Sequence, residues 1–167
     1  MRLVYLASVW LHILAVTAWL GGMLFLILVI VPWMRAGNRQ TGVSILHDVG
    51  VRFRTVGWVC FAIVVATGTF NLYVRGVRLQ SLMDPAFRTS AFGASVCLKL
   101  AVFAAVVVLS AVHDFSVGPA ATQAMQRAPD SPQALRLRRL ASWMGRANAL
   151  LALLLVALGV AIVRGVP

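Results

Sequence analysis

The sequence predicts an all-α integral membrane protein whose core is a bundle of four transmembrane helices. Apolar side chains make up 61% of the 167 residues and charged ones only 11%, and the mean hydropathy is +0.91. The apolar residues gather in four runs, each near the ~20 residues that a helix needs to cross hydrocarbon. Helices satisfy their own backbone polar groups, as a lipid environment requires. We expect one transmembrane domain covering residues 1–167.

The first span is predicted at about residues 3–33, where apolar residues run without a break. This run exceeds the roughly 7 to 15 residues of a signal-peptide core, so we expect it to remain in the protein. Its His12 and Trp19 lie on one helical stripe, with Gly22 one turn further along. Small residues on such a stripe allow close packing of helices.

The second span is predicted at about residues 56–74, after a connection in which we expect a short interfacial helix carrying His47. Thr67 and Asn71 share one face of this span, because they are four residues apart. Both reach the depth of His12, since the two spans run in opposite directions. They are therefore candidate partners for that histidine.

The third and fourth spans are predicted at about residues 91–113 and 147–163. Ser90 or Thr89 is expected to cap the third, and Gly118-Pro119 to end it. Residues 133–146 have the pattern of a basic amphipathic helix, which we expect to lie on the membrane surface.

The formal net charge of +11 comes from residues in the termini and connections, with Lys99 as the exception. This placement favours contact with anionic lipid headgroups over nucleic-acid binding. Nine arginines fall on one side of the predicted membrane and five on the other. The positive-inside rule then places both termini on the periplasmic side of a bacterial inner membrane.

Lys99 is the only lysine in the chain and lies within the third span. A lysine at bilayer centre costs roughly 2.5 to 3.5 kcal/mol, so it marks a functional site by default. His12 and Lys99 both begin roughly 13 Å below the same membrane surface, at ~1.5 Å per residue. Together they can ligate a metal or haem, bind an anionic headgroup or relay protons. The alternatives are a lysine that extends to the interface and a histidine that only packs.

His113 lies on nearly the same face of the third span as Lys99 and is followed by Asp114. It can form an inner polar station, or it can be an interfacial residue with structural hydrogen bonds only. Cys97 is two residues from Lys99 and therefore lies about 200° around the helix, which argues against a thiolate in the same site.

Short motifs in three spans resemble those of the CopD family of copper-resistance membrane proteins. They are Val9-Trp10-Leu11-His12, Trp19-Leu20-Gly21-Gly22, Arg52-Phe53-Arg54-Thr55-Val56-Gly57-Trp58, Thr67-Gly68, Asn71-Leu72, Lys99-Leu100 and Ser110-Ala111-Val112-His113-Asp114-Phe115. The resemblance extends to about Pro119. It implies a copper-related membrane protein, with His12 and His113 as candidate metal ligands.

The pairing of a first-span histidine with a third-span lysine is also similar to HemJ-type protoporphyrinogen oxidases. That resemblance covers His12, Trp19-Leu20-Gly21 and Lys99-Leu100. It implies a b-type haem, since a histidine within the membrane is a natural axial ligand.

The leading hypothesis is a CopD-like inner-membrane protein that handles copper through an intramembrane site. The site would contain His12, Lys99, Trp19 and Asn71, with His12 and His113 as metal ligands. The alternatives are a haem b redox protein and a scaffold subunit without a cofactor. We further expect a homodimer, because four helices leave little room for a conducting path, and a copper or redox partner on the periplasmic side.

Overall fold

The computed structural model describes residues 2–36 and 39–164, with the side chains of 34–36, 39–44, 46 and 47 outside the description. Within these ranges the chain forms helices and connections but no strand. Four long apolar helical segments are able to cross a membrane. The predicted all-α membrane bundle is confirmed.

The first pass consists of α1 (Arg2–Phe25), the π-helix η1 (Leu26–Ile30) and α2 (Val31–Ala36). The chain returns through α3 (Arg39–Val74), a single helix of 36 residues. The prediction of a separate interfacial helix before the second span was therefore wrong. No proline occurs between residues 39 and 74, so nothing in this segment breaks the helix. His47 lies in α3, and its side chain is outside the described residues.

The connection to the third pass contains η2 (Ser81–Met83) and the short helix α4 (Pro85–Thr89). The Asp84 side chain accepts a hydrogen bond from the Ala86 amide at 2.9 Å and caps α4. Ser90 caps α5 (Ala91–Val112) in the same way, as predicted, because its hydroxyl oxygen accepts from the Gly93 amide at 3.0 Å.

The third pass continues beyond its predicted end through the π-helix η3 (His113–Val117) into α6 (Gly118–Arg127). Pro119 lies in the first turn of α6 and has no N–H group to donate, yet it directly follows the π turn and the helical pass continues through it. The Gly118 amide donates to the His113 carbonyl across the wide π turn. The prediction that Gly118-Pro119 ends this helix was thus wrong.

The fourth pass is α7 (Pro132–Arg164), one helix of 33 residues. Residues 133–146 are its first half. The prediction that they form a separate helix on the membrane surface was therefore wrong. At 1.5 Å per residue α7 is about 50 Å long, which exceeds the ~30 Å of a hydrocarbon core. Its basic half therefore extends out of the bilayer in line with the span.

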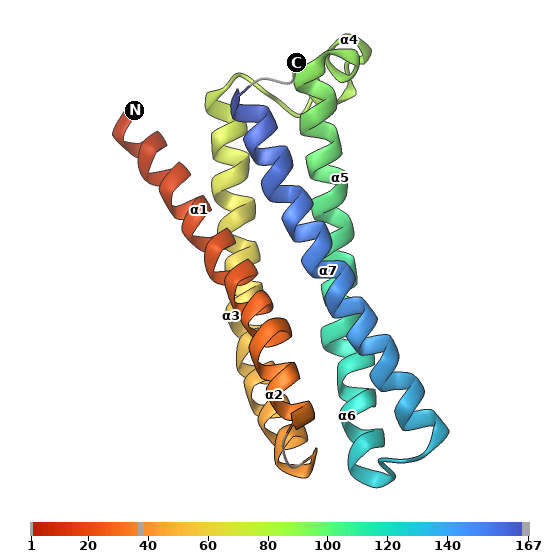
Figure 1. The fold of residues 1–167 in the computed structure, drawn as a ribbon. Coiled ribbons are helices and arrows are strands. Elements are labelled where there is room, and N and C mark those ends of the chain that lie inside the picture. The colour runs from red at the N-terminus through yellow and green to blue at the C-terminus, as the bar shows by residue number, and fades with distance from the viewer. Residues whose placement is uncertain (1, 37–38, 165–167) are drawn as a thin grey trace.

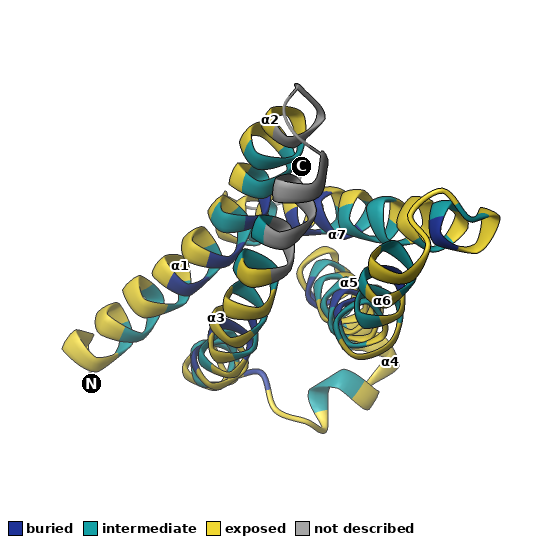
Figure 2. Cartoon of the chain, turned by 90° about the horizontal axis from the view of Figure 1, so that it is seen from below, coloured by how far each residue is buried: buried dark blue, intermediate teal, exposed yellow. Residues whose placement is uncertain are grey.

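The four passes run up and down, so the described ends Arg2 and Arg164 lie at the same end of the bundle (Figure 1). We call this the terminal end and the opposite one the loop end. The helix α1 packs mainly on α3, and α5 mainly on α7. Buried residues occupy the sides of the helices that face one another (Figure 2).

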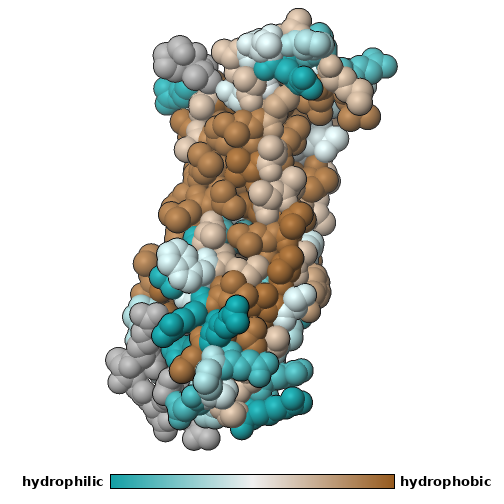
Figure 3. Space-filling model, turned by 90° about the vertical axis from the view of Figure 1, so that its right-hand side faces the viewer, coloured by the Kyte–Doolittle hydropathy of each residue, from teal (hydrophilic) through white to brown (hydrophobic). Residues whose placement is uncertain are grey.

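The core centres on Trp19 and Phe61, whose rings meet edge to face with 5.0 Å between centroids. Large apolar side chains such as Leu3 and Leu150 are exposed on the outside. The surface has a broad apolar belt, with hydrophilic residues gathered at both ends (Figure 3). This distribution suits a helix bundle surrounded by lipid.

Candidate functional site

The polar site nearest the terminal end is built on a hydrogen bond between α1 and α3. His12 Nδ1 lies 2.8 Å from Thr67 Oγ1. The Thr67 hydroxyl also lies 2.6 Å from the Ile63 carbonyl oxygen, to which it donates. Thr67 is 7% exposed, so this pairing lies inside the bundle.

The two hydrogen bonds of Thr67 determine which nitrogen of His12 carries the proton. A hydroxyl has one hydrogen, and a carbonyl oxygen can only accept, so the Thr67 proton points to Ile63. Thr67 Oγ1 must then accept from the N–H group at Nδ1 of His12. In the neutral imidazole this leaves Nε2 with a free lone pair, able to bind a proton or a metal.

Glycine makes the close approach of the two helices possible at this point. A Cβ atom at Gly68 would lie 3.3 Å from Cε1 of His12, closer than side chains normally pack. Gly68 directly follows Thr67, so the residue beside the hydrogen bond has to be small. This contact supplies a physical reason for the Thr67-Gly68 motif.

A polar ladder along α1 and α3 leads from the terminal end to His12. The Ser8 hydroxyl lies 3.5 Å from the Thr67 carbonyl oxygen. Further out, Arg75 Nε donates to the Tyr5 hydroxyl at 3.4 Å. On this side the residues of the ladder recur every four positions, at Thr67 and Asn71 of α3 and at Arg75, which directly follows the helix.

Asn71, the middle residue on the α3 side, has a buried Oδ1 without a hydrogen-bond partner among the described residues. Buried polar atoms in folded proteins are almost always paired, so an unpaired acceptor calls for an explanation. Asn71 lies one helical turn from Thr67 on the same face. Its oxygen is therefore available to a ligand or a water molecule near His12.

Lys99 approaches the same level from α5. A Cβ atom at Gly159 of α7 would lie 3.2 Å from Lys99 Nζ, so a glycine accommodates the amine. No hydrogen bond or ion pair involves Lys99 in the described part of the chain. The structure thus places Lys99 Nζ beside α7, whereas His12 is bonded to α3, and no described hydrogen bond joins the two.

Trp19 lies seven residues beyond His12, about 10 Å along α1. It is 6% exposed and contacts Phe61 and the backbone at Gly57. These contacts belong to the apolar core, and the structure does not place Trp19 beside His12.

His113 belongs to a second polar group, nearer the loop end. It is fourteen residues from Lys99, about 21 Å along the helix, and so cannot share a ligand with His12. Its Nδ1 donates to Asp114 Oδ1 at 3.0 Å. Trp58 Nε1 donates to the other carboxylate oxygen at 3.2 Å.

Two further polar residues near this level were not predicted as partners. Asn148 of α7 donates through Nδ2 to Ser110 Oγ of α5 at 2.8 Å, and its Oδ1 is buried without a described partner. The depth of each residue could be read from the sequence. Their pairing depends on how α5 rotates against α7, which hydropathy does not encode.

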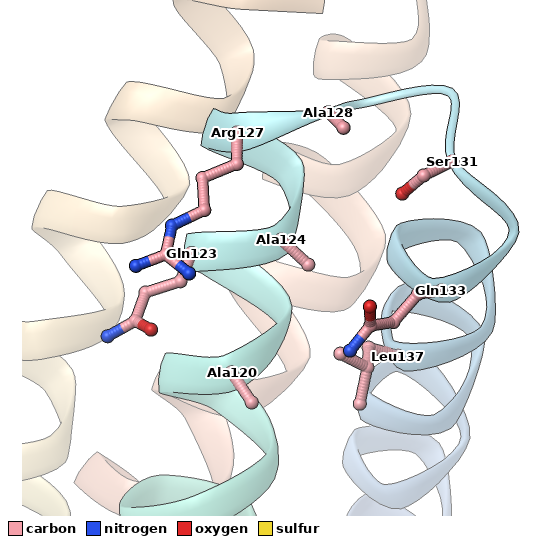
Figure 4. Close-up of a pocket in the computed structure, with 8 residues that line it drawn as sticks. All are labelled: Ala120, Gln123, Ala124, Arg127, Ala128, Ser131, Gln133 and Leu137. Carbon is pink, nitrogen blue, oxygen red and sulfur yellow. The ribbon is translucent and has the colours of Figure 1, made fainter.

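The described residues contain no group of three or more His, Cys, Asp or Glu that could enclose a metal ion. At His12 the additional donors within the described structure are therefore amine and amide groups. A pocket also occurs at the loop end, where Gln133 and Leu137 of α7 face Ala120 and Ala124 of α6 (Figure 4). It is remote from His12 and contains none of the predicted site residues.

The family model described as CopD, copper resistance protein D, matches residues 47–163. The match thus includes Asn71, Lys99 and His113 as well as the fourth pass, and it begins after His12 and Trp19. A protein of Aquifex aeolicus (strain VF5), described as uncharacterized, is 34% identical over 152 residues, 91% of this chain and 90% of the relative. No solved structure matches the chain significantly.

Proposed function

Because this chain belongs to the copper resistance protein D family of membrane proteins, we propose that it handles copper inside the membrane and binds the ion as cargo at His12. The observation that carries this proposal is the hydrogen bond from His12 Nδ1 to Thr67, which leaves Nε2 with a lone pair that can bind a metal ion. A hydrogen bond at the second ring nitrogen is what normally orients a metal-binding histidine.

The chemistry of the neighbouring groups supports a copper ion held by nitrogen and oxygen. Imidazole suits copper, and Cu(II) accepts mixed nitrogen and oxygen donors. Asn71 Oδ1, one turn from Thr67, is an acceptor with no hydrogen-bond partner in the described part of the chain. Lys99 can donate a lone pair only in its neutral form. One strong donor with weak neighbours gives transient binding, which suits an ion in passage better than a resident cofactor.

We propose His113 as a second station toward the loop end. Its Nδ1 donates to the Asp114 carboxylate, so its Nε2 is also left free. The carboxylate–histidine arrangement is common in metal sites, where it raises the basicity of the ligand. Copper would then pass from one histidine level to the other along α5, across the inner membrane of a bacterium, with a copper donor or acceptor on the periplasmic side.

The free Nε2 of His12 is equally the arrangement of an axial haem ligand, which keeps haem b as the competing function. Metal analysis and absorption spectra of the purified full-length protein distinguish the two. We expect copper added in excess to bind to the wild-type protein at equilibrium and not to bind at this site in His12→Ala, with no Soret band in either protein. His113→Ala is the matched control, and it should retain copper at His12.

Three outcomes would overturn the copper proposal. A Soret band that disappears in His12→Ala would establish haem. Copper retained in full by His12→Ala would remove His12 as the ligand. A folded wild-type protein that binds neither copper nor haem would favour the scaffold alternative, in which the polar groups only orient the helices.

A further inference from the structure

The outward face of the basic half of α7 carries a shallow groove that the copper proposal does not use. The groove is lined by residues that recur at helical spacing: Leu135, Arg138, Arg139, Ser142, Trp143 and Arg146. It therefore follows one side of a single helix. Hydrophilic residues gather at this end of the molecule, below the apolar belt (Figure 3).

The depth of the groove follows from the length of α7. The helix ends at Arg164, and Arg146 and Trp143 lie 18 and 21 residues before it, about 27 to 32 Å along the axis. With a hydrocarbon core of ~30 Å, these two residues lie at the opposite interface. Arg138 and Arg139 are a further turn out, at about 38 Å, which is the level of the headgroups.

One arginine of the groove is held in place by its neighbours, and no described acidic residue pairs with the other two. Arg146 donates through Nε to the Ser142 carbonyl at 3.2 Å and through a terminal nitrogen to the Ser142 hydroxyl at 3.1 Å. Its guanidinium also lies over the Trp143 ring, 4.8 Å from the centroid. Arg138 and Arg139 are exposed and have no hydrogen bond or ion pair with any described residue. The sequence of α7 contains no acidic residue.

Apolar surface continues from the groove into the membrane. The Trp143 ring is 66% exposed, and Leu150, two turns nearer the terminal end, is 67% exposed. Tryptophan is typical of the membrane interface, where its ring lies between headgroups and acyl chains. The site thus has positive charges at the level of the headgroups and an apolar surface next to them on the side of the hydrocarbon core.

We propose that this groove binds an anionic phospholipid, with its phosphate between Arg138, Arg139 and Arg146 and its acyl chains along α7 beyond Trp143. Guanidinium groups bind phosphate oxygens in pairs, which favours arginine at such a site. A soluble anion or a nucleic acid has no acyl chain that would contact the apolar surface next to the arginines. The inference is independent of the copper site.

The test is lipid binding by the purified full-length protein in neutral detergent, measured as bound lipid by native mass spectrometry with phosphatidylglycerol or phosphatidylcholine added. We expect phosphatidylglycerol to be retained over phosphatidylcholine. The double variant Arg138→Gln, Arg139→Gln should weaken its binding about 30-fold, from about a factor of 5 for each arginine near a membrane surface.

The matched control is Arg127→Gln, Arg136→Gln, which removes the same charge from this end of the molecule outside the groove. We expect it to weaken binding less than about 5-fold, since such charges act only within a screening length of ~8 Å. Equal losses in both double variants would overturn the proposal in favour of general charge attraction. Competition by inorganic phosphate at low millimolar concentration would overturn it in favour of a free-anion site.

Discussion

The protonation of His12 provides the sharpest test of the site, and Thr67→Val is the change that tests it. Valine matches threonine in shape and removes the oxygen that accepts from His12 Nδ1. The other bond of the hydroxyl, to the Ile63 carbonyl, lies within α3 and leaves no donor unpaired when it is lost. The substitution therefore acts mainly on the imidazole.

The magnitude follows from the free energy of a hydrogen bond between membrane helices, which averages about 0.6 kcal/mol and reaches about 1.7 kcal/mol. If this bond holds the proton on Nδ1, its loss changes the ratio of the two neutral forms about 3- to 18-fold. Loss of a group that orients a metal ligand typically lowers metal affinity 10- to 100-fold. We expect Thr67→Val to lower copper affinity in this range.

The assay is ¹⁵N NMR of the histidine rings at about pH 8, where a free imidazole is neutral. The chain has three histidines, so the signals of His12 are identified by their loss in His12→Gln. In the wild-type protein Nδ1 should carry the proton, and in Thr67→Val the proton should be shared between the two nitrogens. Thr67→Ser retains the hydroxyl and should resemble the wild-type protein.

Two results would contradict this protonation of His12. A wild-type protein with the proton on Nε2 would contradict the assignment of the donor, and with it the free ligand. A Thr67→Val protein with an unchanged spectrum would show that Thr67 does not hold the proton in place.

Three further substitutions probe other contacts. Gly159→Ala should raise the free energy of unfolding by about 0.8 kcal/mol because alanine favours helices, but it should impair copper binding because the new Cβ crowds Lys99 Nζ. Gly145→Ala is the control, since its Cβ meets no neighbouring atom and should only stabilise the helix. Equal copper binding by the two variants would contradict the contact between Gly159 and Lys99. Trp58→Phe should lower the free energy of unfolding by about 1.5 kcal/mol, as it removes a donor to a carboxylate; an unchanged midpoint in denaturant would disprove this. Asn148→Leu should change the free energy of unfolding by less than about 1 kcal/mol, because the lost hydrogen bond to Ser110 is offset by removal of a buried oxygen with no described partner. A loss above about 3 kcal/mol, measured in the same denaturant titration, would show that the two effects do not offset each other.

The family match extends further toward the C-terminus than the motifs do, since it includes the fourth pass. At the other end it begins only at residue 47. His12 lies before that range. His12 is nevertheless tied to the matched range by its hydrogen bond to Thr67, which lies within that range.

The number and the order of the passes were predictable because crossing hydrocarbon requires a long apolar helix, and that requirement is local in sequence. The ends of the helices were less predictable. Hydropathy marks where the apolar part of α7 stops at about residue 147, but the helix itself begins at Pro132. Backbone hydrogen bonds continue where hydrophobicity ends, as long as no residue breaks them.

The four membrane passes follow from the amino-acid sequence, which also predicts similar depths for His12, Lys99 and Asn71, because depth depends only on the number of residues from a helix end. Which side chains meet depends on how the helices pack. Thr67 Oγ1 accepts a hydrogen bond from His12 Nδ1 because Gly68 lets α1 approach α3, whereas Trp19 faces the core beside Phe61. Contacts between helices depend on rotation and distance between their axes, which result from the packing of all side chains together.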